Sequence, residues 1–173
     1  MELEIRFACK SEEEELRDIM LSFSMDLAGD IEEHVILKEG ETICAGAKLS
    51  LLDRNAFHLE VLGVRDDRRG TGAGRLLLSK LLQDPWNYCH GEPLDPDENY
   101  RVTVVSKGDA APFYEKLGFE RCSFSDLDSP YDEQCDTCPD AEKCHPVPMA
   151  LMGGGRLCST QSLYLPKFLK QEK

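Results

Sequence analysis

The chain has 173 residues, of which 41% are hydrophobic and 31% are charged, a composition typical of one folded domain rather than of a disordered chain. Its formal net charge of −13 at pH 7 argues against non-specific binding to nucleic acid or to an anionic membrane surface, because both would repel it. We recognise no signal peptide and no apolar run long enough to cross a bilayer, so we expect a cytoplasmic protein.

A strand and an acidic helix are expected at the start of the chain. Charged and apolar residues alternate from Glu2 to Cys9, which predicts a strand. Ser11 precedes Glu14 by three residues, the spacing of a capping box at the start of a helix. The carboxylates of Glu12 to Glu15 are therefore expected to be exposed to solvent at the first turn of this helix. The apolar positions that follow have helical spacing and would form the buried stripe of the helix: Leu16, Ile19, Met20 and Phe23.

Three strands follow, and the last of them leads into a glycine-rich turn. Strands at His34–Lys38 and Thr42–Leu52 are separated by a hairpin turn signal. Large apolar and β-branched residues from Phe57 to Val64 predict the third strand. A charged turn comes next, then glycines at every second position, and then a Leu-rich helix that runs to Leu82.

A strand that opens through glycines into a helix is suited to binding an anionic phosphate. The first amides of a helix lack intrahelical partners and lie at the positive end of its dipole, and glycines let a ligand approach the backbone. Arg68 and Arg69 would add charge-assisted hydrogen bonds. The spacing differs from the dinucleotide motif G-x-G-x-x-G, because Gly74 comes one residue early, and no Gly-Lys-Ser/Thr of a Walker loop follows.

The second half of the chain predicts three strands and one helix. Tyr100–Ser106 is a strongly β-branched strand that is suited to burial. Ala110–Leu117 is expected to be a helix capped by Asp109. Two further strands are expected at Phe119–Phe124 and Pro146–Met152, with an insertion of about twenty residues between them.

Two segments resemble the GNAT superfamily of acyl-CoA N-acyltransferases. Arg69-Gly70-Thr71-Gly72-Ala73-Gly74 fits the pattern Arg/Gln-x-x-Gly-x-Gly/Ala, and Ala110 to Phe119 resembles the A-x-x-F-Y-E-K-x-G-F segment of that superfamily. Two motifs in the expected order, about 40 residues apart with a strand between them, are more specific than either motif alone. The resemblance covers residues 2–152 and implies an α/β (α+β) GNAT fold, with a mixed, mostly antiparallel central sheet flanked by helices.

The resemblance also implies an activity, the transfer of an acetyl group from acetyl-CoA to an amine. In the family a backbone amide of the central strand polarises the thioester carbonyl, and the arginine-glycine turn binds the cofactor. The positions that would then bind acetyl-CoA are Leu62, Gly63, Val64, Arg68, Arg69, Gly70, Thr71, Gly72, Ala73, Gly74, Arg75 and Phe113. The acceptor, a small-molecule or protein amine, is not identified by the sequence.

Acyl transfer to an amine needs a base for the attacking ammonium and an acid for the leaving thiolate. Tyr114 stands where the resembled family has its thiolate-protonating tyrosine. On a two-residue period, His58 and Glu60 share one strand face with Leu62 and Val64, and either of the first two could take the ammonium proton directly or through a water. The choice between these two bases stays open, as does a purely structural role for each.

Four potential metal ligands lie within eleven residues, in the segment 125–146: Cys135, Cys138, Cys144 and His145. A C-x-x-C turn commonly offers two thiolates to a structural zinc, which takes four N or S ligands. We therefore expect a Cys-rich zinc knuckle whose fourth ligand is His145, Cys122 or Cys158. Free thiols, an incidental disulfide and an iron–sulfur cluster are the alternatives.

The expected organisation is one GNAT acyltransferase domain over residues 1–152, which contains the knuckle at 125–146, and a C-terminal tail over 153–173. A homodimer formed through the tail or the final strand is left open. The alternative to an enzyme is a catalytically weak acyl-CoA-binding module, or a metal- or redox-sensing module, that contacts a partner through the knuckle.

Overall fold

The computed structural model describes residues 2–90 and 98–154. These residues fall into two compact units. The first unit comprises Met1–Leu51 and Phe57–Pro93, and the second comprises Leu52–Ala56 and Leu94–Lys173. The predicted tail beyond residue 154, including Cys158, lies outside the described residues.

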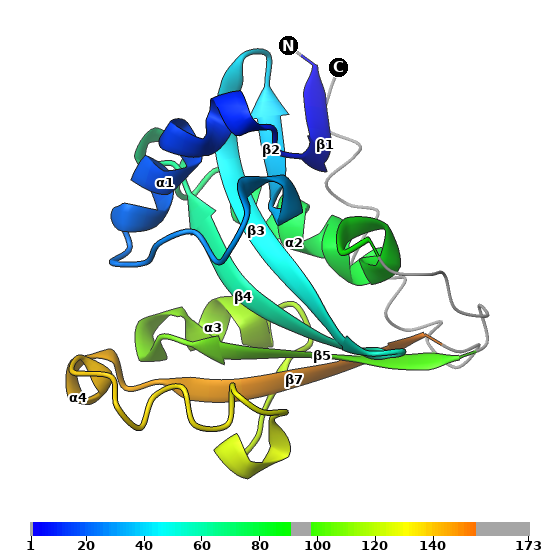
Figure 1. The fold of residues 1–173 in the computed structure, drawn as a ribbon, viewed down its shortest axis with the longest axis vertical. Helices are drawn as coiled ribbons and strands as arrows, with labels where there is room; N and C mark the ends of the chain where they lie inside the picture. Colours follow the sequence, from blue (N-terminus) through cyan, green and yellow to red (C-terminus); the bar gives the residue numbers. More distant parts are fainter. Residues whose placement is uncertain (1, 91–97, 155–173) are drawn as a thin grey trace. The chain divides into compact units, whose positions relative to one another are not determined.

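The strands of the first unit lie in the order in which they occur in the chain. β1 (Leu3–Phe7) pairs antiparallel with β2 (Val35–Glu39), and β2 pairs antiparallel with β3 (Thr42–Asp53). β4 (Ala56–Val64) follows β3 in the sheet. All four strands agree with the sequence prediction within a few residues (Figure 1).

Two helices cover the two faces of this part of the sheet (Figure 1). α1 (Glu13–Leu21) packs its apolar stripe on one face, where Leu16, Ile19 and Met20 are buried with Val61. On the other face lie α2 (Ala73–Gln83) and a 3-10 turn that follows it, Pro85–Tyr88. In that turn Trp86 packs edge-on against Phe57 of β4, with ring centroids 5.5 Å apart.

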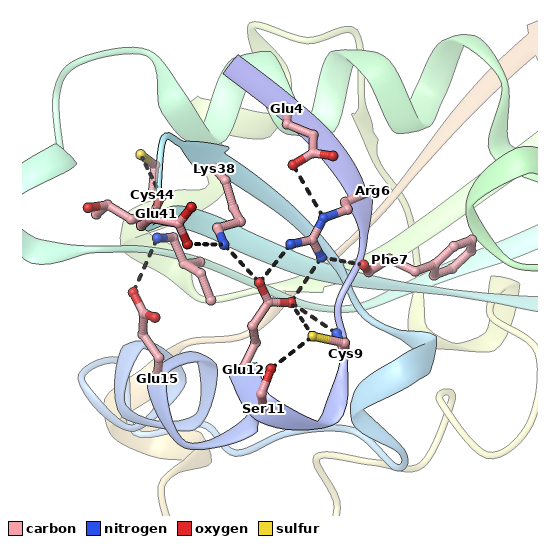
Figure 2. A network of polar contacts seen from close by, with 12 residues as sticks. Glu4, Arg6, Phe7, Cys9, Ser11, Glu12, Glu15, Lys38, Glu41 and Cys44 are labelled. Carbon is pink, nitrogen blue, oxygen red and sulfur yellow. Dashed lines mark hydrogen bonds and ion pairs between the residues drawn. The ribbon is translucent and has the colours of Figure 1, made fainter. Parts of the chain in front are cut away.

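The start of α1 is organised around a buried carboxylate (Figure 2). Lys10–Glu12 forms a 3-10 turn before the helix, and the amide of Cys9 donates to Glu12 Oε2 at 3.0 Å. Glu12 Oε1 accepts hydrogen bonds from Arg6 Nη2 at 2.7 Å and from Lys38 Nζ at 3.0 Å. The expected cap at Ser11 is therefore wrong, and Glu12 is not solvated, since only 8% of it is exposed.

In the second unit β7 (Val147–Gly154) lies between β5 (Asn99–Ser106) and β6 (Glu120–Arg121). β5 and β7 are paired antiparallel along their whole lengths, whereas β6 contributes only two pairs. The strand expected at 119–124 is thus shorter than predicted. The reason is a turn at Ser123, whose amide donates to Asp126 Oδ2 at 2.8 Å.

Two short helices complete the second unit, α3 (Ala111–Glu115) and α4 (Ala141–Cys144). A 3-10 turn, Gly108–Ala110, precedes α3, so Asp109 lies inside that turn and does not cap the helix as expected. Gly153, the first residue of the expected C-terminal tail, lies in β7, where any side chain would overlap the ring of Tyr100.

Candidate functional site

The turn between β4 and α2 has the backbone that the glycine spacing predicted. Gly70 and Gly72 have φ angles of +75° and +90°, a region that residues with a Cβ rarely adopt. Apart from the glycine itself and its two chain neighbours, no described residue has an atom within 4 Å of where a Cβ would stand at either position. The first hydrogen bond of α2 runs from the Leu76 amide to the Gly72 carbonyl at 2.9 Å. The amides before Leu76 therefore form a helix N-terminus that is open to an anion.

Both arginines of this turn are held by other side chains. Arg68 Nη2 lies 2.7 Å from Glu39 Oε2. Arg69 Nη2 lies 2.8 Å from Asp66 Oδ1 and donates to Ser22 Oγ at 3.0 Å. Its guanidinium also lies 4.1 Å from the centre of the Phe23 ring, just after α1. A phosphate that binds the turn would have to share or replace these partners.

The regular alternation of side chains between the two faces of the sheet is interrupted in β4, close to the expected catalytic positions. A Cβ on Gly46 of β3 would point toward Leu16 of α1. Lys48 follows Gly46 by two residues and therefore lies on the same face. Lys48 pairs with Glu60 of β4, which places Glu60 on this side. Gly63 faces α1 as well, since a Cβ there would lie 2.9 Å from Met20 Sδ. Residues three apart face opposite sides of a regular strand, so this change indicates a β-bulge between Glu60 and Gly63.

The bulge corrects the expectation that Glu60, Leu62 and Val64 all lie on one face. A bulge leaves one residue outside the regular ladder. Such an unpaired amide is the kind of donor that can polarise a carbonyl oxygen. Leu62, Gly63 and Val64, the three positions predicted for this role, lie at or just after the bulge.

Glu60 belongs to a three-residue charge array that the sequence analysis missed. Lys48 Nζ lies 3.2 Å from Glu60 Oε2 and 3.3 Å from Glu33 Oε2. The side chains of Lys48 and Glu60 are only 13% and 18% exposed. A Cβ on Gly29 would lie 3.2 Å from both Lys48 Nζ and Glu33 Oε2, so the segment after α1 closes over the array.

That closing segment is fixed by His34, another residue that the sequence analysis did not single out. His34 is fully buried, its Nδ1 lies 2.9 Å from the Asp30 carbonyl oxygen, and its Nε2 accepts the Ala28 amide at 3.1 Å. Burial lowers the pKa of His34. A neutral ring can donate from Nδ1 and accept at Nε2, which both contacts require.

His58 is more deeply buried than Glu60. It is 1% exposed, and burial lowers its pKa to about 4, although Glu60 acts in the opposite direction. The imidazole is therefore neutral near pH 7 and shielded from solvent, whereas 18% of the Glu60 side chain is exposed. The two candidate bases thus differ in their exposure to an acceptor.

Tyr114 lies on α3 of the second unit. It is 7% exposed, and its ring packs edge-on against Phe113 and Phe119 at centroid distances of 5.1 and 5.5 Å. Burial raises the pKa of its phenol above the ordinary value of 10. The phenol is thus protonated at neutral pH, as an acid for a leaving thiolate must be.

The predicted zinc knuckle receives no support from the structure. Among residues 2–90 and 98–154, no three His, Cys, Asp or Glu side chains are grouped so that they could hold a metal ion. Cys135 and Cys144 are half-buried, while Cys138 and His145 are exposed. In these ranges no helix has the length and apolar character needed to cross a bilayer.

Comparisons with known proteins point to one family. A family model described as Acetyltransferase (GNAT) domain matches residues 10–127. No curated protein matches the sequence. Among solved structures, N-acetylglutamate synthase from Neisseria gonorrhoeae, in complex with coenzyme A and N-acetyl-glutamate, has a TM-score of 0.68 at 13% identity over 88% of this chain. The match covers 35% of that enzyme, so this chain spans about a third of its length.

Two other solved structures match over nearly their whole length. Rv2747 from Mycobacterium tuberculosis, in complex with CoA and NLQ, has a TM-score of 0.63 at 14% identity, over 86% of this chain and 98% of that one. The ribosomal-protein-S18-alanine N-acetyltransferase from Escherichia coli has a TM-score of 0.56 at 16% identity, over 90% of this chain and 99% of that enzyme. The expected fold class, α/β with a mixed and mostly antiparallel sheet flanked by helices, is confirmed.

Proposed function

Because the chain belongs to the GNAT acetyltransferase family, we propose that it transfers the acetyl group of acetyl-CoA to the nitrogen of an amine acceptor. Family membership makes the chain an acyl-CoA-dependent N-acyltransferase. The similar proteins from N. gonorrhoeae and M. tuberculosis were solved with coenzyme A, which supports this donor. An amine acceptor is supported by the similarity to the ribosomal-protein-S18-alanine N-acetyltransferase of E. coli.

The observation that carries the proposal is the open helix N-terminus at the turn before α2. Gly70 and Gly72 take backbone conformations that expose the first amides of α2, with free space beside both glycines. A pyrophosphate placed there would accept hydrogen bonds from these amides and would lie at the positive end of the helix dipole. Arg68 or Arg69 would exchange a carboxylate partner for a phosphate oxygen, which is an equally good acceptor.

The proposed reaction has three steps. Glu60 takes a proton from the acceptor ammonium, directly or through a water, and the free amine attacks the thioester carbonyl carbon. An amide at Leu62, Gly63 or Val64 donates to the oxyanion of the tetrahedral intermediate. The C–S bond then breaks, and Tyr114 donates its phenolic proton to the leaving thiolate to give free CoA. The amine nitrogen keeps the acetyl group.

The charge array gives a preference among acceptors. Glu33 and Glu60 place two carboxylates around one ammonium, so the array carries a net charge of −1. A second cation is attracted to such a site, and an anion is repelled. We therefore expect amines that are protonated in solution to be preferred over neutral aromatic amines.

One substitution at the start of α2 tests the donor site without weakening the helix. Ala73 is the first residue of α2, and Ala73→Glu would place a carboxylate where the pyrophosphate is expected. A carboxylate in the first turn of a helix is itself favourable, so folding should be preserved. We expect acetyl-CoA to raise the melting temperature of the wild type and of Ala73→Gln clearly. Its affinity for Ala73→Glu should fall by about tenfold or more, or roughly 1.4 kcal/mol.

Release of free CoA in the presence of an amine panel tests the transfer itself. Wild-type protein that binds acetyl-CoA but acetylates no amine would favour the alternative, a catalytically weak acyl-CoA-binding module. Equal affinity of Ala73→Glu and Ala73→Gln for acetyl-CoA would show that the pyrophosphate does not bind at this helix.

A further inference from the structure

The cysteines of the segment 125–146 lie on a succession of tight turns. The Cys138 amide donates to the Cys135 carbonyl at 3.3 Å, and the Ala141 amide donates to the Cys138 carbonyl at 3.3 Å. The Cys144 amide then donates to the Asp140 carbonyl at 2.8 Å. Cys135 and Cys138 therefore stand at the two ends of one tight turn.

The three thiols differ in their exposure to solvent. Cys138 is exposed to solvent, whereas Cys135 and Cys144 are half-buried. The most reactive of the three toward a dissolved reagent is therefore Cys138, with Cys135 one turn behind it.

The first turn has the dimensions that a disulfide needs. A β-turn closed by a hydrogen bond from residue i+3 to residue i brings the two Cα atoms within about 7 Å. A disulfide spans Cα atoms about 4.4–6.8 Å apart. The backbone at Cys135 and Cys138 therefore requires little movement to form this bond, and the described structure holds both residues as free thiols.

We propose that Cys135 and Cys138 form a reversible disulfide by exchange with a small-molecule disulfide. The thiolate of Cys138 attacks one sulfur of the reagent and releases one thiol, which leaves a mixed disulfide on Cys138. The thiolate of Cys135 then attacks the Cys138 sulfur and releases the second thiol. The two cysteines are oxidised by two electrons, and the reagent is reduced to two thiols.

This redox site is in contact with the turn that begins the helix of Tyr114. Gly108 opens that turn, and a Cβ there would lie 2.7 Å from the His145 carbonyl oxygen and 3.2 Å from the Cys144 carbonyl oxygen. His145 itself has a φ of +48°, so the backbone at this contact has little freedom to adjust. A change in the backbone conformation at Cys144 and His145 would therefore displace the turn at Gly108 that precedes α3.

Oxidised glutathione is the probe that tests the proposal. We expect full-length protein incubated with it to lose two alkylatable thiols, Cys135 and Cys138, and to regain both after reduction. Cys138→Ser should prevent the loss of Cys135. Cys122→Ser is the matched control, because Cys122 lies in the same unit outside these turns, and it should leave the pair intact. Mass spectrometry of differentially alkylated peptides reads out each position without any need for transferase activity.

Three outcomes would overturn the proposal. One is a wild-type protein that carries only mixed disulfides with glutathione at Cys138. Another is a disulfide that joins Cys135 to Cys144, Cys122 or Cys158 instead of Cys138. The third is a pair that reacts only after a chelator has removed a bound metal, which would favour the zinc knuckle.

Discussion

The ammonium of Lys48 lies 3.2 Å from the carboxylate of Glu60, and both side chains are largely shielded from solvent. Glu33 holds the same ammonium from its other side at 3.3 Å. An ion pair in a shielded place is stronger than one in water. Lys48 therefore fixes the direction of the Glu60 carboxylate on β4, next to the bulge.

The first prediction concerns the rate of transfer in Lys48→Met. Without the ammonium, the Glu60 carboxylate loses the partner that fixes its direction, so kcat/KM should fall by up to about 10²-fold. Lys48→Arg keeps the charge and should retain more of the rate. Steady-state release of free CoA measures the difference. Equal kcat/KM for wild type and Lys48→Met would show that this ion pair does not position a base.

The second prediction concerns Tyr114→Phe, which removes the phenolic proton and keeps the ring that packs against Phe113 and Phe119. We expect kcat to fall by about 10²–10⁴, the usual contribution of a general acid. The affinity for acetyl-CoA should change little, because the variant lacks only one oxygen atom. Steady-state kinetics and a binding titration separate these two effects. Tyr88→Phe, in the turn after α2, is the control; turnover of Tyr114→Phe equal to that of the control would exclude Tyr114 as the acid.

Features that depend on neighbouring residues in the sequence could be predicted, and the glycine turn is the clearest case. Gly70 and Gly72 take positive φ angles that only glycine adopts readily, so their spacing alone indicated the turn. The strands of both units also followed from local patterns. The short β6 is an exception, because the turn at Ser123 ends it early.

Features that depend on the pairing of distant segments could not be predicted. The burial of Glu12 is one such feature. Its partners Arg6 and Lys38 lie 6 and 26 residues away in the sequence, and they come close to its carboxylate only when β1 pairs with β2. A bulge in an apolar strand has no signal in the sequence, so the prediction that Leu62 lies on the same face of β4 as Glu60 was wrong. Lys48 did leave a signal, as the single charged residue from Thr42 to Leu52. Its role still required the positions of Glu33 and Glu60.

The third prediction concerns stability and the buried carboxylate of Glu12. Arg6, through its hydrogen bonds, holds the pKa of Glu12 well below its ordinary value of 4.5, and Lys38 acts in the same direction. A depressed pKa in the folded state means that this stabilisation is present above about pH 4.5 and is lost as the pH falls. Glu12→Gln leaves two cations without their carboxylate and should cost about 3 kcal/mol at pH 7.

Urea unfolding at pH 7 and at pH 4 measures this difference. The gap between wild type and Glu12→Gln should narrow at pH 4, where the wild type begins to lose the contribution of Glu12. Glu14→Gln is the matched control, since Glu14 is exposed, and it should change the free energy of unfolding by less than about 0.5 kcal/mol. Equal midpoints for wild type and Glu12→Gln at pH 7 would mean that the network contributes nothing to stability.

The fourth prediction concerns the contact between α1 and β3 at Gly46. A Cβ at this position would collide with Leu16 Cδ1, and Leu16 is fully buried. Gly46→Ala should therefore destabilise the protein by about 1–3 kcal/mol through overpacking. Leu16→Ala alone should cost about 2–5 kcal/mol, because it leaves a cavity under the helix. In the double variant the new methyl group occupies part of that cavity, so its cost should be smaller than the sum of the two single costs.

A double-mutant cycle of urea unfolding measures this coupling between Gly46 and Leu16. Residues in direct contact show coupling energies of about 0.5–3 kcal/mol, whereas independent sites add within about 0.5 kcal/mol. Simple additivity here would mean that α1 lies farther from β3 than the structure places it. Coupling in the expected direction would support the packing of α1 on the face of the sheet that carries Lys48 and Glu60, and with it the position of the charge array.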